Sequence, residues 1–252
     1  MSIEEIEGNY PDILYKYIDA QGGVSMLETE QLWFSRALTL NDPYDCYHVS
    51  KFKADYLDFS VELDYNEIFQ YTGVCSLTDN PLNFLMWSYY NQHMGICVGI
   101  DINIVKKVIG YHKTVNKYVE LKKVKYQDEL PLLNPYAIMP KNYLEVKDDP
   151  DHINNAQTAI NNFLSTKAKW WEHEKEYRLI LRENPNYSEA PKPAKAQIAG
   201  LIKEVYIGCK CKNEDIDLVI QIAQRQNFPV YQLKLQSDNF GLETLQLHTS
   251  SK

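Results

Sequence analysis

The stretch Ile96-Cys97-Val98-Gly99-Ile100 is short, apolar and bounded by turn-forming or polar residues. Such a run is typical of a buried β-strand. Further strands are predicted at 13–17, 31–35, 74–77, 118–126, 174–182, 204–207 and 230–235, helices at 103–109, 153–164 and 214–226, and a turn at Gly22-Gly23. Because strands and helices alternate irregularly, the sequence predicts an α+β fold with a mixed or split β-sheet and flanking helices.

The segment that leads into residues 96–100 has helical periodicity. Asp79 or Asn80 is suited to cap a helix, with Pro81 in the first turn and Gly95 at the end. The apolar stripe of this helix consists of Leu82, Leu85, Met86 and Tyr89. We expect this stripe to face the core.

The length and composition of the chain limit the class of protein to which it can belong. The chain has 252 residues, which fits a single domain spanning 1–252, with a possible long insertion at the proline-bearing segment 130–151. A net charge of −8 argues against broad attraction to nucleic acid or to an anionic membrane. Five scattered cysteines do not suggest a disulfide framework, and the acidic N-terminus does not resemble a signal peptide. We therefore expect a cytoplasmic protein without a membrane span.

The usual motifs for phosphate and zinc are missing. No GxGxxG and no GxxxxGK[ST] occurs, so there is no sequence evidence for a dinucleotide fold or a P-loop. His173-Glu174 begins like HExxH, but Tyr177 stands where the second histidine would be. Cys209 and Cys211 lack both the CxxC spacing and a matching pair. The sequence therefore predicts no metal site.

The strongest candidate for chemistry is the segment 171–178, Trp-Glu-His-Glu-Lys-Glu-Tyr-Arg. On a strand that begins at residue 174, Glu174, Glu176 and Arg178 share one face. Neighbouring carboxylates raise one another's pKa and an adjacent arginine lowers it, an arrangement typical of acid/base or cation-stabilising sites. The alternative is a solvated strand face with ordinary ion pairs.

Two other segments carry candidate binding residues. Asn-Asp-Pro-Tyr-Asp at 41–45 is a strong turn former, and aromatic residues lie off the predicted apolar stripe near the end of the helix. We expect these groups to lie near the Glu174 segment, because one shared site explains separated polar signatures most simply. The candidates are Asn41, Asp42, Asp45, Trp87, Tyr90, His93 and Trp171. The same aromatics are also able to pack under residues 130–151.

A fourth feature is basic. Seven lysines between Lys106 and Lys125 are accompanied by one acid, Glu120, and by three tyrosines. Such a patch is able to attract a phosphate-bearing substrate or a nucleic acid. Lysines that protect an edge strand would give the same pattern, and we favour that interpretation slightly.

Several of these motifs together resemble a widespread bacterial family, a domain of unknown function. The resemblance rests on YKY at 15–17, LWFS at 32–35, NDPYD at 41–45, residues 85–101 and the K-x3-W-x2-ExExR pattern at 167–178. No activity is implied by this family. Signatures of this type do place polar residues in turns and at strand ends, where sites are commonly built.

A fainter resemblance is to ADP-ribosyltransferase-like toxins and defence proteins. It implies a split sheet, and polar or aromatic residues on two early strands, which would be Tyr15, Lys16 or Tyr17 on the first and Ser35 on the second. It also implies a late glutamate, Glu174 or Glu176, that binds the nicotinamide ribose of NAD. The first strand departs from that pattern, since it lacks the usual His or Arg.

Three functions follow from these observations. The first is a nucleotide- or nucleic-acid-directed enzyme of the ADP-ribosyltransferase-like type, with Glu174, Glu176 and Arg178 catalytic and NAD as a possible substrate. The second is a non-catalytic domain that binds a ligand or partner. The third is a metal-dependent phosphodiesterase using Asp42, Asp45, Glu174 and Glu176. A closed, dry network around these residues would favour the binding domain, and an open cleft would favour an enzyme.

Overall fold

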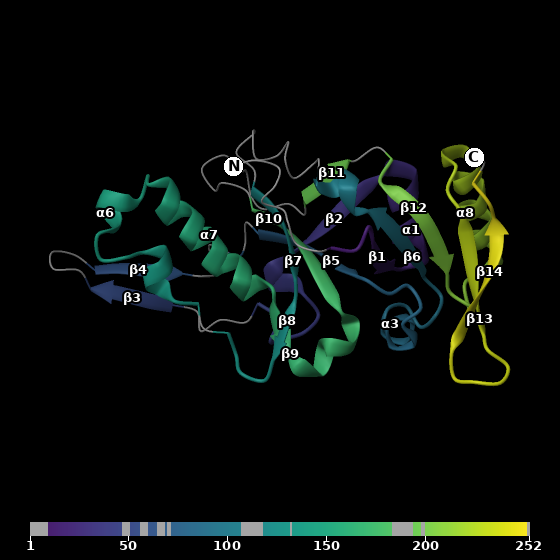
Figure 1. The fold of residues 1–252 in the computed structure, drawn as a ribbon, viewed down its shortest axis with the longest axis horizontal. Helices are drawn as coiled ribbons and strands as arrows, with labels where there is room; N and C mark the ends of the chain where they lie inside the picture. The colour runs from purple at the N-terminus through teal and green to yellow at the C-terminus, as the bar shows by residue number, and fades with distance from the viewer. Residues whose placement is uncertain are drawn as a thin grey trace.

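The chain folds around a ten-stranded mixed sheet with flanking helices, which confirms the α+β prediction (Figure 1). The computed structural model describes residues 10–46, 51–55, 60–64, 69, 72–106, 118–131, 133–182, 194–197 and 200–250. No helix in these ranges is long and apolar enough to cross a membrane.

The sheet has two wings that meet at one strand. The first wing contains, in spatial order, β11 (Ala194–Gln197), β2 (Gln31–Arg36), β5 (Thr72–Thr78), β10 (Glu176–Arg182) and β7 (Tyr118–Lys123). The second contains β1 (Ile13–Ile18), β6 (Ile96–Asp101), β12 (Ile202–Ile207), β13 (Val230–Leu235) and β14 (Leu242–His248). Neighbouring strands are antiparallel except for the parallel pair β12 and β13.

Strand β5 holds the wings together. One of its edges pairs with β10 from end to end. The other edge is shared, because β2 pairs with it at Gly73 and Val74 while β1 reaches it only through Tyr15 opposite Thr78. The sheet therefore splits beside the end of β5.

Helices cover the two faces of the sheet unequally. On one face α1 (Ala20–Thr29) and α8 (Asn213–Gln226) contact each other over the main apolar core. On the other lies α7 (Pro150–Leu164) (Figure 1). Its Ile160 and Phe163 pack with Val74 and Ile180. The remaining elements are α3 (Phe84–Tyr89), α5 (Pro135–Ile138), α6 (Tyr143–Val146), η2 (Ala37–Thr39), η3 (Lys169–Glu174), and the strand pairs β3 (Lys51–Asp55) with β4 (Ser60–Asp64) and β8 (Lys125–Gln127) with β9 (Thr166–Ala168).

The predicted turn at Gly22-Gly23 is wrong, because both glycines lie inside α1. The Asp19 side chain caps this helix by accepting a hydrogen bond from the backbone N–H of Gly22. A Cβ on Gly23 would lie 2.1 Å from Ile96 Cδ1 on β6. Glycine is present for close helix-to-sheet packing here, and not for a turn.

The helix before β6 also differs from the prediction. It begins at Phe84 with Asn83 as its cap and has only six residues. Leu82, Leu85 and Tyr89 of the predicted stripe are 39%, 44% and 60% exposed, whereas Trp87 is fully buried. A helix of less than two turns cannot carry a stripe from 82 to 89, and the tryptophan dominates its burial.

Two strand predictions need correction as well. Strand β10 begins at Glu176, while Glu174 ends η3 and Lys175 has a left-handed backbone with φ of 46°. The paired strands β3 and β4 also lie where the sequence predicted no strand.

Substituting the two glycines of α1 separates packing from helix propensity. We expect Gly23→Ala to lower the free energy of unfolding by about 1–3 kcal/mol, because its Cβ would overlap Ile96. Gly22→Ala is the matched control, since its nearest contact is the flexible Ile18 side chain at 3.0 Å and alanine favours a helix. Urea unfolding of both variants measures the difference. Equal stability of the two would contradict this account.

Candidate functional site: a buried charge network

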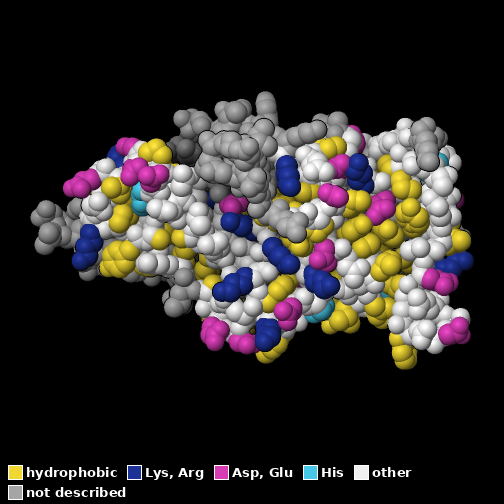
Figure 2. Space-filling model, viewed as in Figure 1, with side chains coloured by type: hydrophobic (Ala, Val, Ile, Leu, Met, Phe, Trp, Pro, Cys, Tyr) yellow, Lys and Arg dark blue, Asp and Glu magenta, His cyan; other side chains and the backbone are white. Residues whose placement is uncertain are grey.

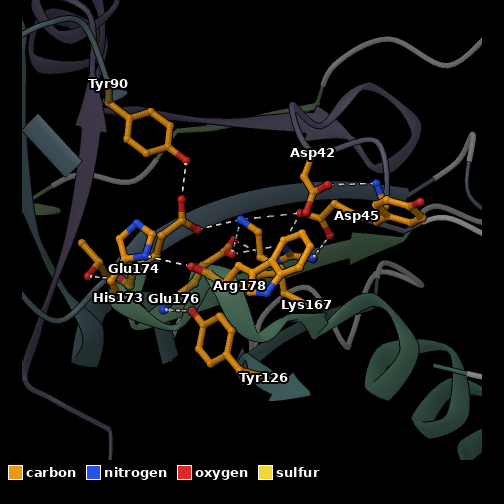
Figure 3. Close-up of polar contacts among 12 residues, drawn as sticks. Asp42, Asp45, Tyr90, Tyr126, Lys167, His173, Glu174, Glu176 and Arg178 are labelled. Carbon is orange, nitrogen blue, oxygen red and sulfur yellow. Dashed lines mark hydrogen bonds and ion pairs between the residues drawn. The ribbon is translucent and has the colours of Figure 1, made fainter. Parts of the chain in front are cut away.

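Arg178 lies at the centre of the most extensive polar network in the described residues, and its side chain is fully buried (Figure 3). Its Nε and Nη2 donate to Glu176 Oε1 and Oε2 at 2.8 and 3.0 Å. Its Nη1 and Nη2 donate to Asp45 Oδ1 and Oδ2 at 2.7 and 2.5 Å. Nη1 also donates to the Leu164 carbonyl at 2.6 Å. A guanidinium has five N–H donors, so every one of them has an acceptor.

Strand alternation places these groups on one face. Glu176 and Arg178 point away from the main core, which receives Tyr177 and Leu179. Ser76 lies opposite Arg178 on β5, and its side chain hydrogen-bonds to Glu176. The sheet thus places the Glu176 carboxylate, the Arg178 guanidinium and the Ser76 hydroxyl at neighbouring positions.

Lys167 joins the third carboxylate to this network. Its Nζ donates to Glu174 Oε2 at 2.6 Å and lies 3.5 Å from Glu176 Oε2 and 3.9 Å from Asp45 Oδ2. The same nitrogen lies 4.7 Å from the ring centroid of Trp171. Both Lys167 and Glu174 have side chains that are only 2% exposed.

Two tyrosines border the network. The Tyr90 hydroxyl donates to Glu174 Oε1 at 3.0 Å (Figure 3). Asn41 hydrogen-bonds to the Tyr90 side chain as well. The Tyr126 hydroxyl accepts from the backbone N–H of Glu176 at 2.7 Å. Tyr90 and Tyr126 are half-buried and Asn41 is exposed, so this border of the network is partly open to solvent.

The surroundings of these groups shift their pKa values in definite directions. Burial opposes the charged form of Glu176, but Arg178, Lys167 and Ser76 together lower the pKa of its carboxyl to about 2. Burial likewise opposes the charged form of Lys167, but the neighbouring carboxylates raise its pKa. Burial and Glu174 raise the pKa of Tyr90, so its hydroxyl remains a donor. Asp45 and Glu174 form ion pairs with the same two cations, so three carboxylates face Lys167 and Arg178.

The structure brings together many of the residues singled out in the sequence. From the turn, from the end of α3 and from 171–178, the network and its border contain Asn41, Asp45, Tyr90, Trp171, Glu174, Glu176 and Arg178. Asp42 is buried beside them, and its Oδ1 accepts from the Tyr44 N–H. The shared location predicted for the turn and the Glu174 segment is therefore present.

Trp87 and His93 lie beside the site, without a hydrogen bond or ion pair to its charged groups. The Trp87 indole N–H donates to the Pro81 carbonyl, and its ring packs against Tyr17. His93 Nε2 lies 3.1 Å from Ser88 Oγ. Since Ser88 donates to the Phe84 carbonyl, its oxygen accepts from His93, whose pKa is lowered by burial and by Lys210.

The early strands contribute less than the sequence suggested. The Tyr17 hydroxyl donates to the Asn80 carbonyl, and its ring reaches Tyr90 at 6.4 Å between centroids. Lys16 contacts the Ser76 carbonyl at 3.5 Å, and Ser35 lies opposite Val74 on β5. Tyr15 belongs elsewhere, because its hydroxyl donates to Glu204 on β12.

Sequence reasoning missed three members of the site. Lys167 was visible only as the first letter of the K-x3-W-x2-ExExR pattern, where nothing indicated that it would meet both glutamates. Ser76 stands on β5, where the sheet register brings it close to Glu176. Tyr126 stands on β8, outside that sheet, and its hydroxyl accepts from the backbone N–H of Glu176.

The lysine segment does not form one described patch. Lys122 pairs with Glu120, whereas Lys123 lies over the Tyr177 ring on the other face of β7. Lys106 lies over Tyr10. Lys107, Lys113 and Lys117 are outside the described residues, so nucleic-acid binding stays a prediction.

Loss of Arg178 should destabilise the fold strongly. Arg178→Met leaves Asp45 and Glu176 buried without their main partner, and we expect a loss of about 3–5 kcal/mol in unfolding free energy. Arg225→Met on the exposed side of α8 is the control and should change it by less than about 1 kcal/mol. Denaturant unfolding would contradict the role of Arg178 if the two variants lost the same amount.

The depressed pKa of Glu176 also predicts an acid limb of stability. A carboxyl with a folded pKa of about 2 and an ordinary value of 4.5 contributes stability above pH 4.5, and this contribution is lost as pH falls toward 2. Glu176→Gln should therefore show a shallower loss of stability from pH 5 to 2.5 than the wild type. The exposed Glu172→Gln is the control. Parallel curves for all three proteins would overturn the prediction.

Comparison with known proteins identifies a family but no activity. No curated protein and no solved structure matches the chain. Residues 86–179 match the model of a family described as a protein of unknown function, DUF2971. The matched segment contains Tyr90, Tyr126, Lys167, Glu174 and Glu176, and ends one residue after Arg178. Over residues 86–179 the chain is therefore similar to the DUF2971 family of unknown function.

Proposed function

We propose that the chain is a nucleotide-directed enzyme of the ADP-ribosyltransferase-like type, with Glu174 as the acting carboxylate and NAD as the donor substrate. One observation carries the proposal. The buried network contains Asp45, Glu174 and Glu176 against Lys167 and Arg178, so three negative charges meet two positive ones and one negative charge is in surplus. A buried negative charge stabilises a cation that develops beside it.

The surplus charge is best assigned to Glu174. Both oxygens of Glu176 and both oxygens of Asp45 accept hydrogen bonds from Arg178. Glu174 pairs through Oε2 with Lys167, while its Oε1 accepts only from the neutral Tyr90 hydroxyl. Glu174 therefore keeps unused acceptor capacity, and Glu176 with Arg178 serves as its support.

The chemistry of ADP-ribosyl transfer suits such a group. The bond between the nicotinamide nitrogen and ribose C1′ breaks, and the leaving nicotinamide takes the electron pair and becomes neutral. Positive charge develops on the ribose, an acceptor nucleophile or water bonds to C1′, and that nucleophile releases its proton to the medium. A carboxylate that accepts a hydrogen bond from a ribose hydroxyl stabilises this transition state.

Tyr90 shows where such a hydroxyl would bind. Its own hydroxyl donates to Glu174 Oε1, and its side chain is half-buried at the border of the network. Substrate binding at Glu174 then requires Tyr90 to move aside. The three residues that follow it, Asn91, Gln92 and His93, all have left-handed backbones with φ of 68°, 51° and 65°. Such strain is concentrated at functional sites, which supports a role for this segment.

The fold offers further support. The ADP-ribosyltransferase-like pattern includes a split sheet and a serine or aromatic residue on an early strand. In this chain the serine that contacts a glutamate is Ser76 on β5, and not Ser35 on β2. Lys16 on β1 stands near the same strand through its contact with the Ser76 carbonyl.

A non-catalytic binding domain is the second candidate, because Glu174 and Glu176 are only 2% and 4% exposed and both form ion pairs with Lys167. In that case the surplus charge binds a cationic ligand without turnover. The phosphodiesterase alternative has less support. Lys167 and Arg178 already neutralise the carboxylates that would bind a metal, and no group of three His, Cys, Asp or Glu in the described residues is placed to hold one.

Matched glutamine variants test the proposal. Nicotinamide release from NAD, followed by chromatography, should fall about 100-fold or more in Glu174→Gln with little change in melting temperature. Glu176→Gln should lower the melting temperature, because it disturbs the pairing of Arg178. Glu172→Gln, exposed in the same 3-10 turn, should match the wild type in both measurements.

The outcomes separate the candidates. Absence of NAD turnover in the wild type, together with calorimetric binding of NAD that Glu174→Gln weakens, would leave the binding domain. Wild-type turnover that survives in Glu174→Gln would remove Glu174 as the acting carboxylate. If the wild type neither turns over nor binds NAD, NAD is neither the substrate of an enzyme nor the ligand of a binding domain here.

A further inference from the structure

A tyrosine-rich face lies on the second wing of the sheet. Three half-buried tyrosines, Tyr15, Tyr206 and Tyr231, come from β1, β12 and β13. The Tyr206 and Tyr231 rings are stacked at 5.1 Å between centroids, and Tyr15 meets Tyr206 edge to face at 6.0 Å. Figure 2 shows hydrophobic side chains gathered over this wing on the face viewed.

One carboxylate stands among these rings. Glu204 Oε1 accepts hydrogen bonds from the hydroxyls of Tyr15 at 2.7 Å and Tyr206 at 3.2 Å. Burial and Glu204 raise the pKa of both tyrosines, so each hydroxyl stays protonated and donates. Among the described residues, no hydrogen bond reaches Oε2 of Glu204 and no basic side chain forms an ion pair with it.

A glycine leaves the space in which this arrangement forms. Gly99 on β6 lies opposite both Tyr15 and Glu204 in the sheet register. A Cβ at Gly99 would lie 2.8 Å from Glu204 Cγ and 3.2 Å from Tyr15 Cε1. The absent side chain thus leaves room for the carboxylate and the ring to meet across β6.

We propose that Tyr15, Glu204, Tyr206 and Tyr231 form a second binding site, which takes a guanidinium group such as an arginine side chain. A guanidinium is planar, stacks on aromatic rings and donates to carboxylates, so it matches both halves of the site. The half-buried Glu204 lacks a cationic partner among the described residues, and the bound group supplies it. The two tyrosine hydroxyls fix the orientation of the carboxylate and leave Oε2 to the ligand.

This site is separate from the proposed catalytic carboxylate. Tyr15 was a candidate substrate-binding residue in the sequence, yet its contacts are with Glu204 and Tyr206, and the described contacts place neither in the network of Glu174. The two proposals therefore fail or succeed independently.

Calorimetric titration with Nα-acetyl-arginine amide tests the site in the full chain. The wild type should bind this probe with a Kd on the order of 1 mM, as expected of a ligand of this size. Glu204→Gln keeps an acceptor for Tyr15 and Tyr206 but removes the charge, and should weaken binding about tenfold. Glu243→Gln on the exposed side of β14 makes the same charge change and should bind like the wild type.

Two additional measurements sharpen the result. Tyr231→Leu should weaken binding of the probe severalfold while leaving Glu204 in place, because it removes one stacked ring. The peptide Gly-Gly-Arg-Gly-Gly distinguishes the source of the guanidinium. Tighter binding of the peptide than of the amide assigns the site to a segment of a partner protein, and equal binding assigns it to a free guanidinium compound.

The proposal is overturned by either of two results. One is binding of the arginine probe that is as tight in Glu204→Gln as in the wild type, with both proteins folded by their melting transitions. The other is equal affinity for the lysine analogue of the probe, because a site that requires a planar stacked group discriminates against an ammonium.

Discussion

The pairing of one guanidinium with two buried carboxylates is the constraint on which the site depends. Arg178 binds Glu176 on its own strand, Asp45 in the turn after η2, and the carbonyl of Leu164 at the end of α7. These segments are far apart in the sequence. Burying three charges is costly unless each is paired, so the fold is satisfied only when strand, turn and helix all reach the same place.

Because of this requirement, the three acidic residues have different partners. Asp45 and Glu176 are committed to Arg178, and Lys167 bridges them to Glu174. Glu174 therefore lies at the margin of the network, next to Tyr90, and not at its centre beside Arg178. The margin is also close to the place where β1 leaves β5 and the sheet splits, since Tyr17 of β1 packs near Tyr90.

Periodicity predicted most of the sheet but not the parts that depend on tertiary contact. The strands at 96–100 and 230–235 were recognisable because burial imposes a continuous apolar or alternating pattern on them. Gly22-Gly23 was read as a turn, since sequence alone cannot show that Ile96 occupies the space of a side chain. The predicted apolar stripe of α3 was wrong for a similar reason, because the helix buries Trp87 and leaves most of that stripe exposed.

The sequence predicted which residues lie together in the site, but not how their side chains are arranged. Alternation correctly set Glu176 and Arg178 on one face, while the left-handed backbone at Lys175 removed Glu174 from the strand and turned it toward Lys167 and Tyr90. No local pattern encodes that change of direction.

The left-handed segment after Tyr90 explains how the margin is held. Each of Asn91, Gln92 and His93 adopts a conformation that costs an L-residue roughly 1–2 kcal/mol, so the segment persists only if its surroundings compensate. They do so through backbone hydrogen bonds, from the His93 N–H to the Trp87 carbonyl at 2.8 Å and from the Lys210 N–H to the His93 carbonyl at 3.0 Å. Lys210 follows β12, the strand of Glu204 and Tyr206. The segment after Tyr90 is thereby held by a backbone hydrogen bond to the residues that follow β12, the strand of the tyrosine-rich face.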